Sequence, residues 1–253
     1  MYTKKAENAV RIGTAGWSIP RNHGGPVPGE GSHLERYSLL LSCTEINSSF
    51  HLHHRPSTYA RWAVSTPADF RFSVKIPKAI THDCALTPTH EQLQSFLSEV
   101  GNLGDKLGPI LFQLPPRQSF DEPRARAFFT LFRNLHPKGN AVLEPRHPAW
   151  FSPEAGRLLE EFRMTRVIAD PPRASAAAHT GGYRGLTYYR LHGSPRIYYS
   201  SYSGLWLNDL ATRLCTEHPT SEVWCIFDNT ASGAAFENAV TLTSALKVAT
   251  SEL

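Results

Sequence analysis

The sequence predicts an α/β protein in which a parallel sheet forms a TIM-like (β/α)8 barrel. Short runs of β-forming residues alternate with longer amphipathic segments along the chain, as expected for parallel strands covered by helices. Eight such units in 253 residues match the size and strand number of this barrel. A doubly wound open sheet is the alternative. No internal repeat, linker or low-complexity segment divides the chain, so we expect one domain over residues 1–253.

The predicted strands are short, and several show the two-residue periodicity of a β-strand. In the third, FRFSVKIP, Phe72, Val74 and Ile76 share one side and Ser73 and Lys75 the other. We therefore expect the apolar side to pack under the helices and the polar side to face the barrel interior. The eight strands are predicted at residues 10–16, 43–50, 70–77, 108–115, 141–147, 166–170, 186–193 and 222–229.

The predicted helices begin at residues that are typical of helix starts. Ser32 and Thr89 are candidate N-caps, Ser152 precedes a proline, and two acids open the segment from Asp121. Helices are expected at residues 32–42, 56–66, 89–104, 121–135, 152–163, 205–217 and 233–249. Residues 171–185, between the sixth and seventh strands, are too rich in proline and glycine for a full helix. An irregular crossover is expected there.

Composition narrows the function classes. No apolar run approaches the roughly 20 residues that span a bilayer, and residues 1–13 contain lysines but no apolar signal core. We therefore expect a cytoplasmic protein with no membrane partner. The four cysteines are scattered, which favours free thiols. The net charge of +4 comes without a long Lys/Arg run, so nucleic-acid binding is only weakly supported.

Polar and aromatic side chains recur at the carboxyl ends of the predicted strands. Catalytic groups gather at that face of a barrel, so these residues are predicted to share one pocket. The candidate catalytic residues are Glu45, Lys75, Glu144 and His192. The candidate ligand-binding residues are Trp17, Asn47, His82, Gln113, Arg146, His147, Asp170, Arg190, Tyr199, Asp228 and Asn229. A structural ion-pair network among the charged members is the alternative interpretation.

With these motifs in place, the chain resembles the YecE-like family, also called domain of unknown function 72. The resemblance runs from about residue 11 to 246 and is carried, in order, by IGTAGWS, TEINSSFH, FRFSVKIPKAITH, LGPILFQLPP, LEPRHPAW, YYRLHG and CIFDNTASGAAFENA. It implies a TIM-like barrel but no established reaction. Many relatives carry tyrosine where this chain has His51, so no role is expected of an aromatic side chain there.

Metal-free acid/base chemistry on a small anionic or sugar-phosphate-like ligand is the preferred function. Hydrolysis, isomerisation and lyase chemistry remain open. Glu144 is the preferred acid or base, and Arg146 and Arg190 offer bidentate contacts to phosphate or carboxylate. Lys75 is either an electrostatic clamp or a Schiff-base nucleophile, and His192 is a candidate proton shuttle. No P-loop, Rossmann fingerprint or nucleophile elbow is present.

Two rival functions follow from other residues. A metal-dependent phosphodiesterase acting on nucleic acid would use the carboxylates and histidines as ligands, although the nearby cations oppose a divalent ion. No cofactor is therefore predicted. A non-catalytic binder of a polyhydroxylated or nucleic-acid ligand would use the aromatic residues Trp17, Trp150, Tyr198, Tyr199 and Tyr202. Oligomeric state is not predicted.

Overall fold

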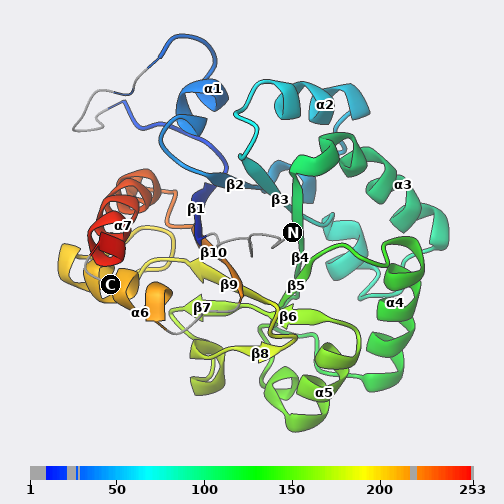
Figure 1. Ribbon diagram of the computed structural model, residues 1–253. Coiled ribbons are helices and arrows are strands. Elements are labelled where there is room, and N and C mark those ends of the chain that lie inside the picture. Colours follow the sequence, from blue (N-terminus) through cyan, green and yellow to red (C-terminus); the bar gives the residue numbers. More distant parts are fainter. Residues whose placement is uncertain (1–9, 22–26, 28, 217–220, 252–253) are drawn as a thin grey trace, which may run out of the picture.

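A computed structural model describes residues 10–21, 27, 29–216 and 221–251 of the chain. The expectation of no signal segment concerns residues 1–13, of which 1–9 lie outside the described part, as does Glu217 at the end of the sixth predicted helix. Parallel strands curl around a central axis, and helices surround them (Figure 1). The predicted TIM-like α/β architecture is confirmed.

Within the described residues the sheet has ten strands, in the order β7-β9-β10-β1-β2-β3-β4-β5-β6-β8. All adjacent pairs are parallel except β6 with β8. The strands are β1 (Val10–Ala15), β2 (Cys43–Ile46), β3 (Arg71–Lys75), β4 (Leu107–Gln113), β5 (Ala141–Glu144), β6 (Met164–Arg166), β7 (Ile168–Asp170), β8 (Gly181–Gly182), β9 (Leu186–Leu191) and β10 (Glu222–Phe227).

One interrupted strand brings the two ends of this sheet together. Only Val167 separates β6, which pairs with β5, from β7, which pairs with β9. These two pieces are the predicted sixth strand, and they complete the TIM-like arrangement. The crossover that follows has a 3-10 turn, η5 (Ser175–Ala178), and the two-residue β8 in place of a helix. The irregular crossover predicted at residues 171–185 is thus confirmed.

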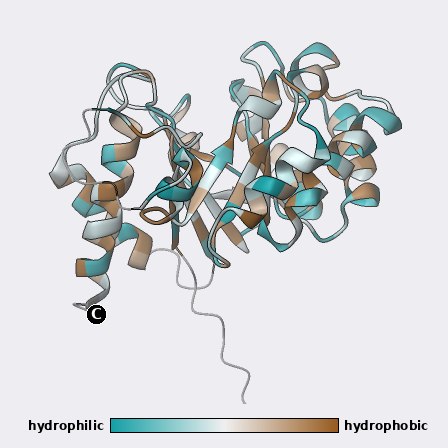
Figure 2. Ribbon diagram, turned by 90° about the horizontal axis from the view of Figure 1, so that it is seen from above, coloured by the Kyte–Doolittle hydropathy of each residue, from teal (hydrophilic) through white to brown (hydrophobic). Residues whose placement is uncertain are grey.

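The predicted helices are found, with shifted ends. They are α1 (His33–Ser38), α2 (Pro56–Val64), α3 (His90–Val100), α4 (Glu122–Leu135), α5 (Pro153–Glu161), α6 (Gly204–Thr216) and α7 (Ala234–Ser251). Ser32 and Thr89 form capping boxes, and Asp121 and Ser152 accept a bond from the third backbone N–H of their helices. Amphipathic faces, coloured brown and teal in Figure 2, turn their apolar side toward the sheet.

The expected inward and outward parities of β3 are correct. Phe72, Val74 and Ile76 belong to the large core between sheet and helices, whereas Ser73 and Lys75 lie on the opposite side. A second, smaller apolar cluster fills the barrel interior. Its residues are Cys43, Leu111, Val142, Val167, Leu186, Tyr188, Trp224 and Ile226. The interior is therefore apolar in its lower layers, and polar residues follow toward the carboxyl ends.

Several strands end earlier than predicted. After β2 the chain turns into a 3-10 helix, η1 (Ser48–Phe50), and β5 ends at Glu144, directly before Pro145. The missing backbone N–H of proline explains the second case.

Trp150 is 1% exposed and donates from Nε1 to the carbonyl of Gln118 at 3.0 Å. It therefore anchors the segment after β5.

No helix in the described part of the chain has both the length and the apolar character needed to cross a membrane.

The close contact between β1 and β2 requires glycine at position 13. Gly13 pairs with Cys43, and a Cβ there would lie 2.0 Å from the carbonyl oxygen of Cys43. We expect Gly13→Ala to lower the free energy of unfolding by roughly 3 kcal/mol, measured by denaturant titration. The control Gly156→Ala, in α5 with open space around the added carbon, should raise it by about 0.5–1 kcal/mol. Equal effects at the two positions would contradict the assigned register.

Candidate functional site

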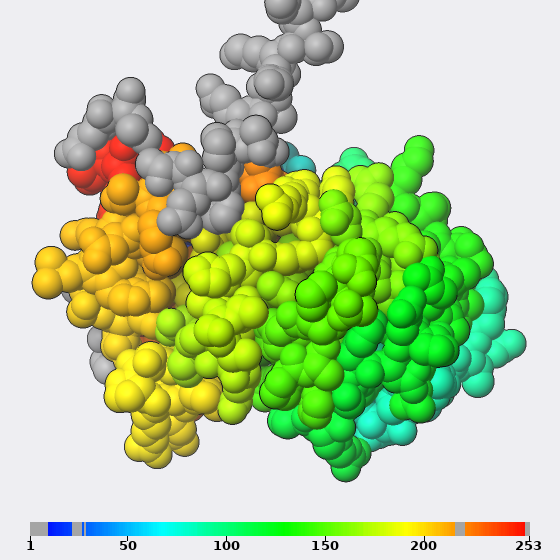
Figure 3. All heavy atoms as spheres, turned by 90° about the horizontal axis from the view of Figure 1, so that it is seen from below, coloured from blue at the N-terminus to red at the C-terminus, as the bar shows by residue number. Residues whose placement is uncertain are grey.

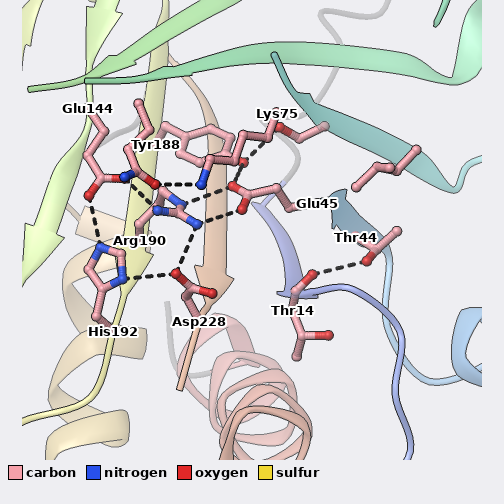
Figure 4. Close-up of polar contacts among 12 residues, drawn as sticks. Thr14, Thr44, Glu45, Lys75, Glu144, Tyr188, Arg190, His192 and Asp228 are labelled. Carbon is pink, nitrogen blue, oxygen red and sulfur yellow. Dashed lines mark hydrogen bonds and ion pairs between the residues drawn. The ribbon is translucent and has the colours of Figure 1, made fainter. Parts of the chain in front are cut away.

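Polar and charged side chains from β3, β4, β5, β9 and β10 meet at the carboxyl end of the barrel. Lys75, Gln113 and Glu144 are the last residues of β3, β4 and β5. Arg190 is the penultimate residue of β9, and His192 and Asp228 directly follow β9 and β10. Because the strands are parallel, their ends lie at one face, and the side chains converge there (Figure 4). These residues therefore meet at the carboxyl face of the barrel, where the sequence predicted a shared pocket.

Arg190 is the centre of this cluster. Its side chain is fully buried, and its guanidinium donates to Glu45 through Nε at 3.0 Å and Nη2 at 2.7 Å. Nη2 also donates to Asp228 at 3.0 Å, and Nη1 donates to Glu144. We call Glu45, Glu144 and Asp228 the carboxylate cage. Burial of so many charges is costly unless they are paired, and here each carboxylate is paired with the same cation.

His192 links two members of the carboxylate cage. Its Nδ1 lies 3.0 Å from Asp228 and its Nε2 lies 3.1 Å from Glu144. Burial alone would lower the pKa of His192, but the two carboxylates raise it above its ordinary value. In the protonated form both ring nitrogens donate, so the imidazolium balances one charge of the cage.

Glu144 is held as a carboxylate. Burial would raise its pKa, but the charges of Arg190 and His192 hold the pKa well below its ordinary value. The same two groups lower the pKa of Asp228 against the effect of its burial. A carboxylate with so low a pKa is a weak base. Glu144 therefore fits the role of a fixed negative charge better than the acid/base role expected from the sequence.

Tyr188 is a member of the cluster that sequence reasoning missed. Its hydroxyl donates to Glu45 at 2.8 Å and lies 2.8 Å from the hydroxyl of Ser73, deep in the barrel. Tyr188 shares its strand parity with Arg190 and His192, so the spacing 188, 190, 192 could have identified it. Glu45 is fully buried and receives bonds from Arg190 and Tyr188. Glu45 therefore helps to hold Arg190 and Tyr188 in place, and its catalytic role stays a prediction.

Lys75 has surroundings quite different from those of Arg190. Its ammonium donates to the Gln113 side-chain carbonyl at 2.6 Å and lies 4.0 Å from the centre of the Phe50 ring. Within the described part of the chain, no carboxylate lies at ion-pair distance from it. Burial, followed by the positive charge of Arg190, lowers the pKa of Lys75 to about 8. Phe50, on η1, was not predicted to contribute.

Arg146, two residues after the end of β5, is partly buried and has donors to spare. Its Nη2 is 3.5 Å from Glu144 and 3.4 Å from the Tyr198 hydroxyl, both long contacts. Its Nε is buried and has no acceptor among the described residues. Tyr198 packs edge-on against His192 and has a left-handed backbone with φ of 70°. The segment after β9 that carries Tyr198 projects from the surface, in yellow at the lower left of Figure 3.

His82 completes a basic group with Lys75 and Arg146. It lies in a short π-helix, η2 (Ala79–Asp83), and its ring packs edge-on against Phe50 at 5.1 Å. Burial first, and then the charges of Lys75 and Lys78, lower the pKa of His82, with a smaller contribution from Arg146. The charges of Lys75 and Arg146 therefore both act on the His82 ring. We call Lys75, His82 and Arg146 the basic rim.

Two predicted ligand contacts face the wrong side of the sheet. Asp170 lies on the outer parity of β7 with Ile168, and its carboxylate accepts a bond from the Tyr202 hydroxyl at 2.8 Å. Asn229 is fully buried and donates to the Ser200 carbonyl and to Asn238, both at 2.9 Å. Both residues fasten the segment after β9 to its neighbours. The structure does not bring them together with the carboxyl-face cluster, because the residue next to an inward position faces outward.

The remaining predicted residues surround the cluster. Trp17 packs edge-on against Trp62, and together with Asn47 it lines a separate hollow of about 290 Å³. His147 accepts a bond from the backbone of Ala149, as the cap of the turn Pro148–Phe151. Tyr199 is 46% exposed and its ring stacks under the guanidinium of Arg196 at 3.9 Å. None of these four joins the carboxylate cage or the basic rim.

Arg190 also corrects an expectation. Full burial and four bonds to carboxylates leave it no position from which to receive an anion. Among the described residues, no group of three or more His, Cys, Asp or Glu side chains has the geometry to hold a metal ion. The guanidinium occupies the space between the carboxylates of Glu45, Glu144 and Asp228. The cage therefore resembles the structural ion-pair alternative considered above.

Arg190→Met should remove the counterion of the cage. We expect a loss of about 3–5 kcal/mol in the free energy of unfolding at pH 7, measured by denaturant titration, because three buried carboxylates lose their partner. Arg157→Met, on the exposed face of α5, is the matched control and should change stability by less than about 1 kcal/mol.

The same variant has a predicted pH dependence. Lowered pKa values of Glu144 and Asp228 stabilise the wild type above their ordinary values of 4.5 and 3.8, and this stability is lost as the pH falls through the folded-state pKa values. Without Arg190 both pKa values should rise, so the deficit of the variant should shrink between pH 7 and about pH 4. A deficit that grows on acidification would contradict the assigned charges.

Comparison with known proteins places the fold and the family. The family model "Protein of unknown function DUF72" matches residues 11–253. A DUF72 family protein from Enterococcus faecalis superposes with a TM-score of 0.77 at 20% identity, covering 94% of this chain and 96% of that one. For a DUF72 family protein from Thermotoga maritima the values are 0.76, 22%, 94% and 99%.

The matches to two named relatives cover a smaller part of each chain. The UPF0759 protein YecE of Escherichia coli is 28% identical over 181 residues, which are 69% of this chain and 64% of YecE. The UPF0759 protein YunF of Bacillus subtilis is 27% identical over 152 residues, 57% of this chain and 53% of YunF. The match thus spans less than two thirds of each relative. With the family model covering nearly the whole chain, this protein belongs to the DUF72 family.

Proposed function

We propose that this protein is an enzyme that performs acid/base chemistry on a small anionic ligand at the carboxyl face of its barrel. The observation that carries the proposal is the separation of charge in the site. Arg190 and His192 form ion pairs with all three buried carboxylates. Among the described residues, Lys75 has no carboxylate partner and the buried Nε of Arg146 has no acceptor. Unused cationic donors at an opening favour an anion as ligand.

Arg146 is the proposed contact to the anionic group. Its charge is permanent, its Nε lacks an acceptor, and its present contacts to Glu144 and Tyr198 are long. A phosphate or carboxylate could replace these weak contacts with a bidentate pair. Glu144 and Tyr198 would then orient the guanidinium from the protein side.

Lys75 is the proposed proton-exchanging group, in place of Glu144. An acid or base works best when its pKa lies near the working pH, and that of Lys75 is about 8. The strongly lowered pKa of Glu144 makes it less suitable. Lys75 is only 9% exposed, and His192 and Asp228 beside it are equally enclosed. So enclosed a position favours a small ligand over a nucleic-acid chain.

We propose that this chemistry needs no metal or cofactor, because the carboxylates that would hold a cation already bind Arg190 and His192. The rival phosphodiesterase function would need them free. The choice among hydrolysis, isomerisation and lyase chemistry depends on the ligand, and the basic rim supports all three.

Inorganic phosphate is a suitable probe for the anion site. We expect isothermal titration calorimetry to show one phosphate bound per wild-type chain, and Arg146→Met to weaken binding by at least about tenfold, because a charged hydrogen bond contributes roughly 1.5–3 kcal/mol. Arg157→Met removes the same charge from an exposed helix position and should bind like the wild type. Equal affinity of the Arg146 variant, or no binding by the wild type, would refute the proposed anion contact.

A further inference from the structure

The surroundings of Lys75 are those of a reactive amine. The side chain extends from the last residue of β3 into the site, where its ammonium contacts an amide oxygen and an aromatic face. The nearby carboxylates of the cage form ion pairs with Arg190 and His192 instead of with Lys75. An ammonium that lacks a carboxylate partner and lies in a poorly hydrated place loses its proton easily, which creates a free lone pair.

An imidazole shares the aromatic neighbour of this amine. Lys75 and His82 pack against the same ring of Phe50, at 4.0 Å for the ammonium and 5.1 Å for the imidazole. His82 bonds to the Thr81 hydroxyl through Nδ1, which leaves Nε2 for proton exchange. Burial and the nearby charges of Lys75 and Lys78 lower the pKa of His82, so it is neutral near pH 7 and able to accept a proton.

We propose that Lys75 is a covalent nucleophile, which forms a Schiff base with the aldehyde or ketone carbonyl of a small anionic substrate. This inference rests on the proposed function and names its substrate class: a carbonyl compound that carries a phosphate or carboxylate group. Arg146 holds the anionic group, and the carbonyl carbon lies at the Lys75 amine. If Lys75 served only as a positive charge that binds an anion, it would not need a nearby base such as His82. A nucleophilic amine does need one, because it must first lose a proton.

The proposed step is balanced in atoms and charge. His82 first removes a proton from the Lys75 ammonium. The amine lone pair then forms a C–N bond while the carbonyl π electrons move to oxygen, and a proton passes from nitrogen to that oxygen to give a carbinolamine. The imidazolium returns its proton to the hydroxyl, the C–O bond breaks, and water leaves as the C=N bond forms. The product is a protonated imine, and His82 is again neutral.

The imine explains why the carboxylate cage lies next to Lys75. A protonated imine withdraws electrons from the adjacent carbon, so bonds to that carbon break more easily. The charges of Glu45, Glu144 and Asp228 partly offset the lowering of the Lys75 pKa, although none of them pairs with it directly. Fixed negative charges in this position favour the cationic imine over the neutral carbonyl compound. The inferred chemistry therefore belongs to the isomerase or lyase classes.

Reductive trapping tests the inference directly. Purified full-length protein is incubated at pH 7 with glyoxylate, a small anionic aldehyde, and sodium cyanoborohydride, and the adduct is located by peptide mass spectrometry. We expect one carboxymethyl group at Lys75, formed at least about tenfold faster than at any other lysine. Excess inorganic phosphate should slow this labelling by competing at Arg146. Labelling spread evenly over the lysines, or concentrated away from Lys75, would overturn the inference.

Matched variants separate the possible outcomes. Lys75→Arg keeps the positive charge but has no nucleophilic amine, so it should bind phosphate and resist labelling, whereas the control Lys138→Met, at an exposed position outside the site, should label like the wild type. His82→Gln should slow labelling at least about fivefold. If phosphate binds through Arg146 but Lys75 is not labelled, the Schiff base is refuted and the proposed anion site stands. If Lys75 is labelled but phosphate does not bind, the anion site fails instead.

Discussion

The buried guanidinium of Arg190 is the interaction on which the rest of the site depends. It satisfies acids from three separate strands, and His192 joins two of these acids a second time (Figure 4). An unpaired carboxylate in the barrel would be strongly destabilising, so this cation allows three of them to stay ionised near the carboxyl face. The polar upper layer of the barrel can then rest directly on the apolar interior around Tyr188 and Trp224.

The distribution of partners assigns different tasks to chemically similar groups. Arg190 and Lys75 are both buried cations, but the first has three carboxylate partners and the second has an amide oxygen and a phenyl ring. Burial, and then the charge of Arg190, lower the pKa of Lys75, while Arg190 stays charged. Glu144 contacts Arg190, His192 and Arg146, so it connects the enclosed cage with the basic rim. Structural and reactive roles thus lie within one cluster.

The sequence predicted the barrel because periodicity and helix caps are local properties. Strand parity also placed Lys75, Glu144 and His192 at one face. Parity could not tell which charges pair, since pairing depends on distances between strands far apart in sequence, and Arg190 was therefore taken for a ligand contact. Asp170 was misplaced because Val167, between β6 and β7, faces the interior. Side chains alternate along the strand, so Ile168 and Asp170 face outward. Phe50 escaped notice because η1 replaces the expected end of the second strand.

The central claim is that Arg190 is reserved for the carboxylates and that the basic rim is left to bind the ligand. A crystal structure of the protein soaked in sulfate tests it most directly. The account predicts a sulfate bound by Arg146 and Lys75, with Arg190 still bonded to Glu45 and Asp228. A sulfate bound to Arg190 in place of either carboxylate, or bound only at sites remote from Arg146 and Lys75, would contradict it.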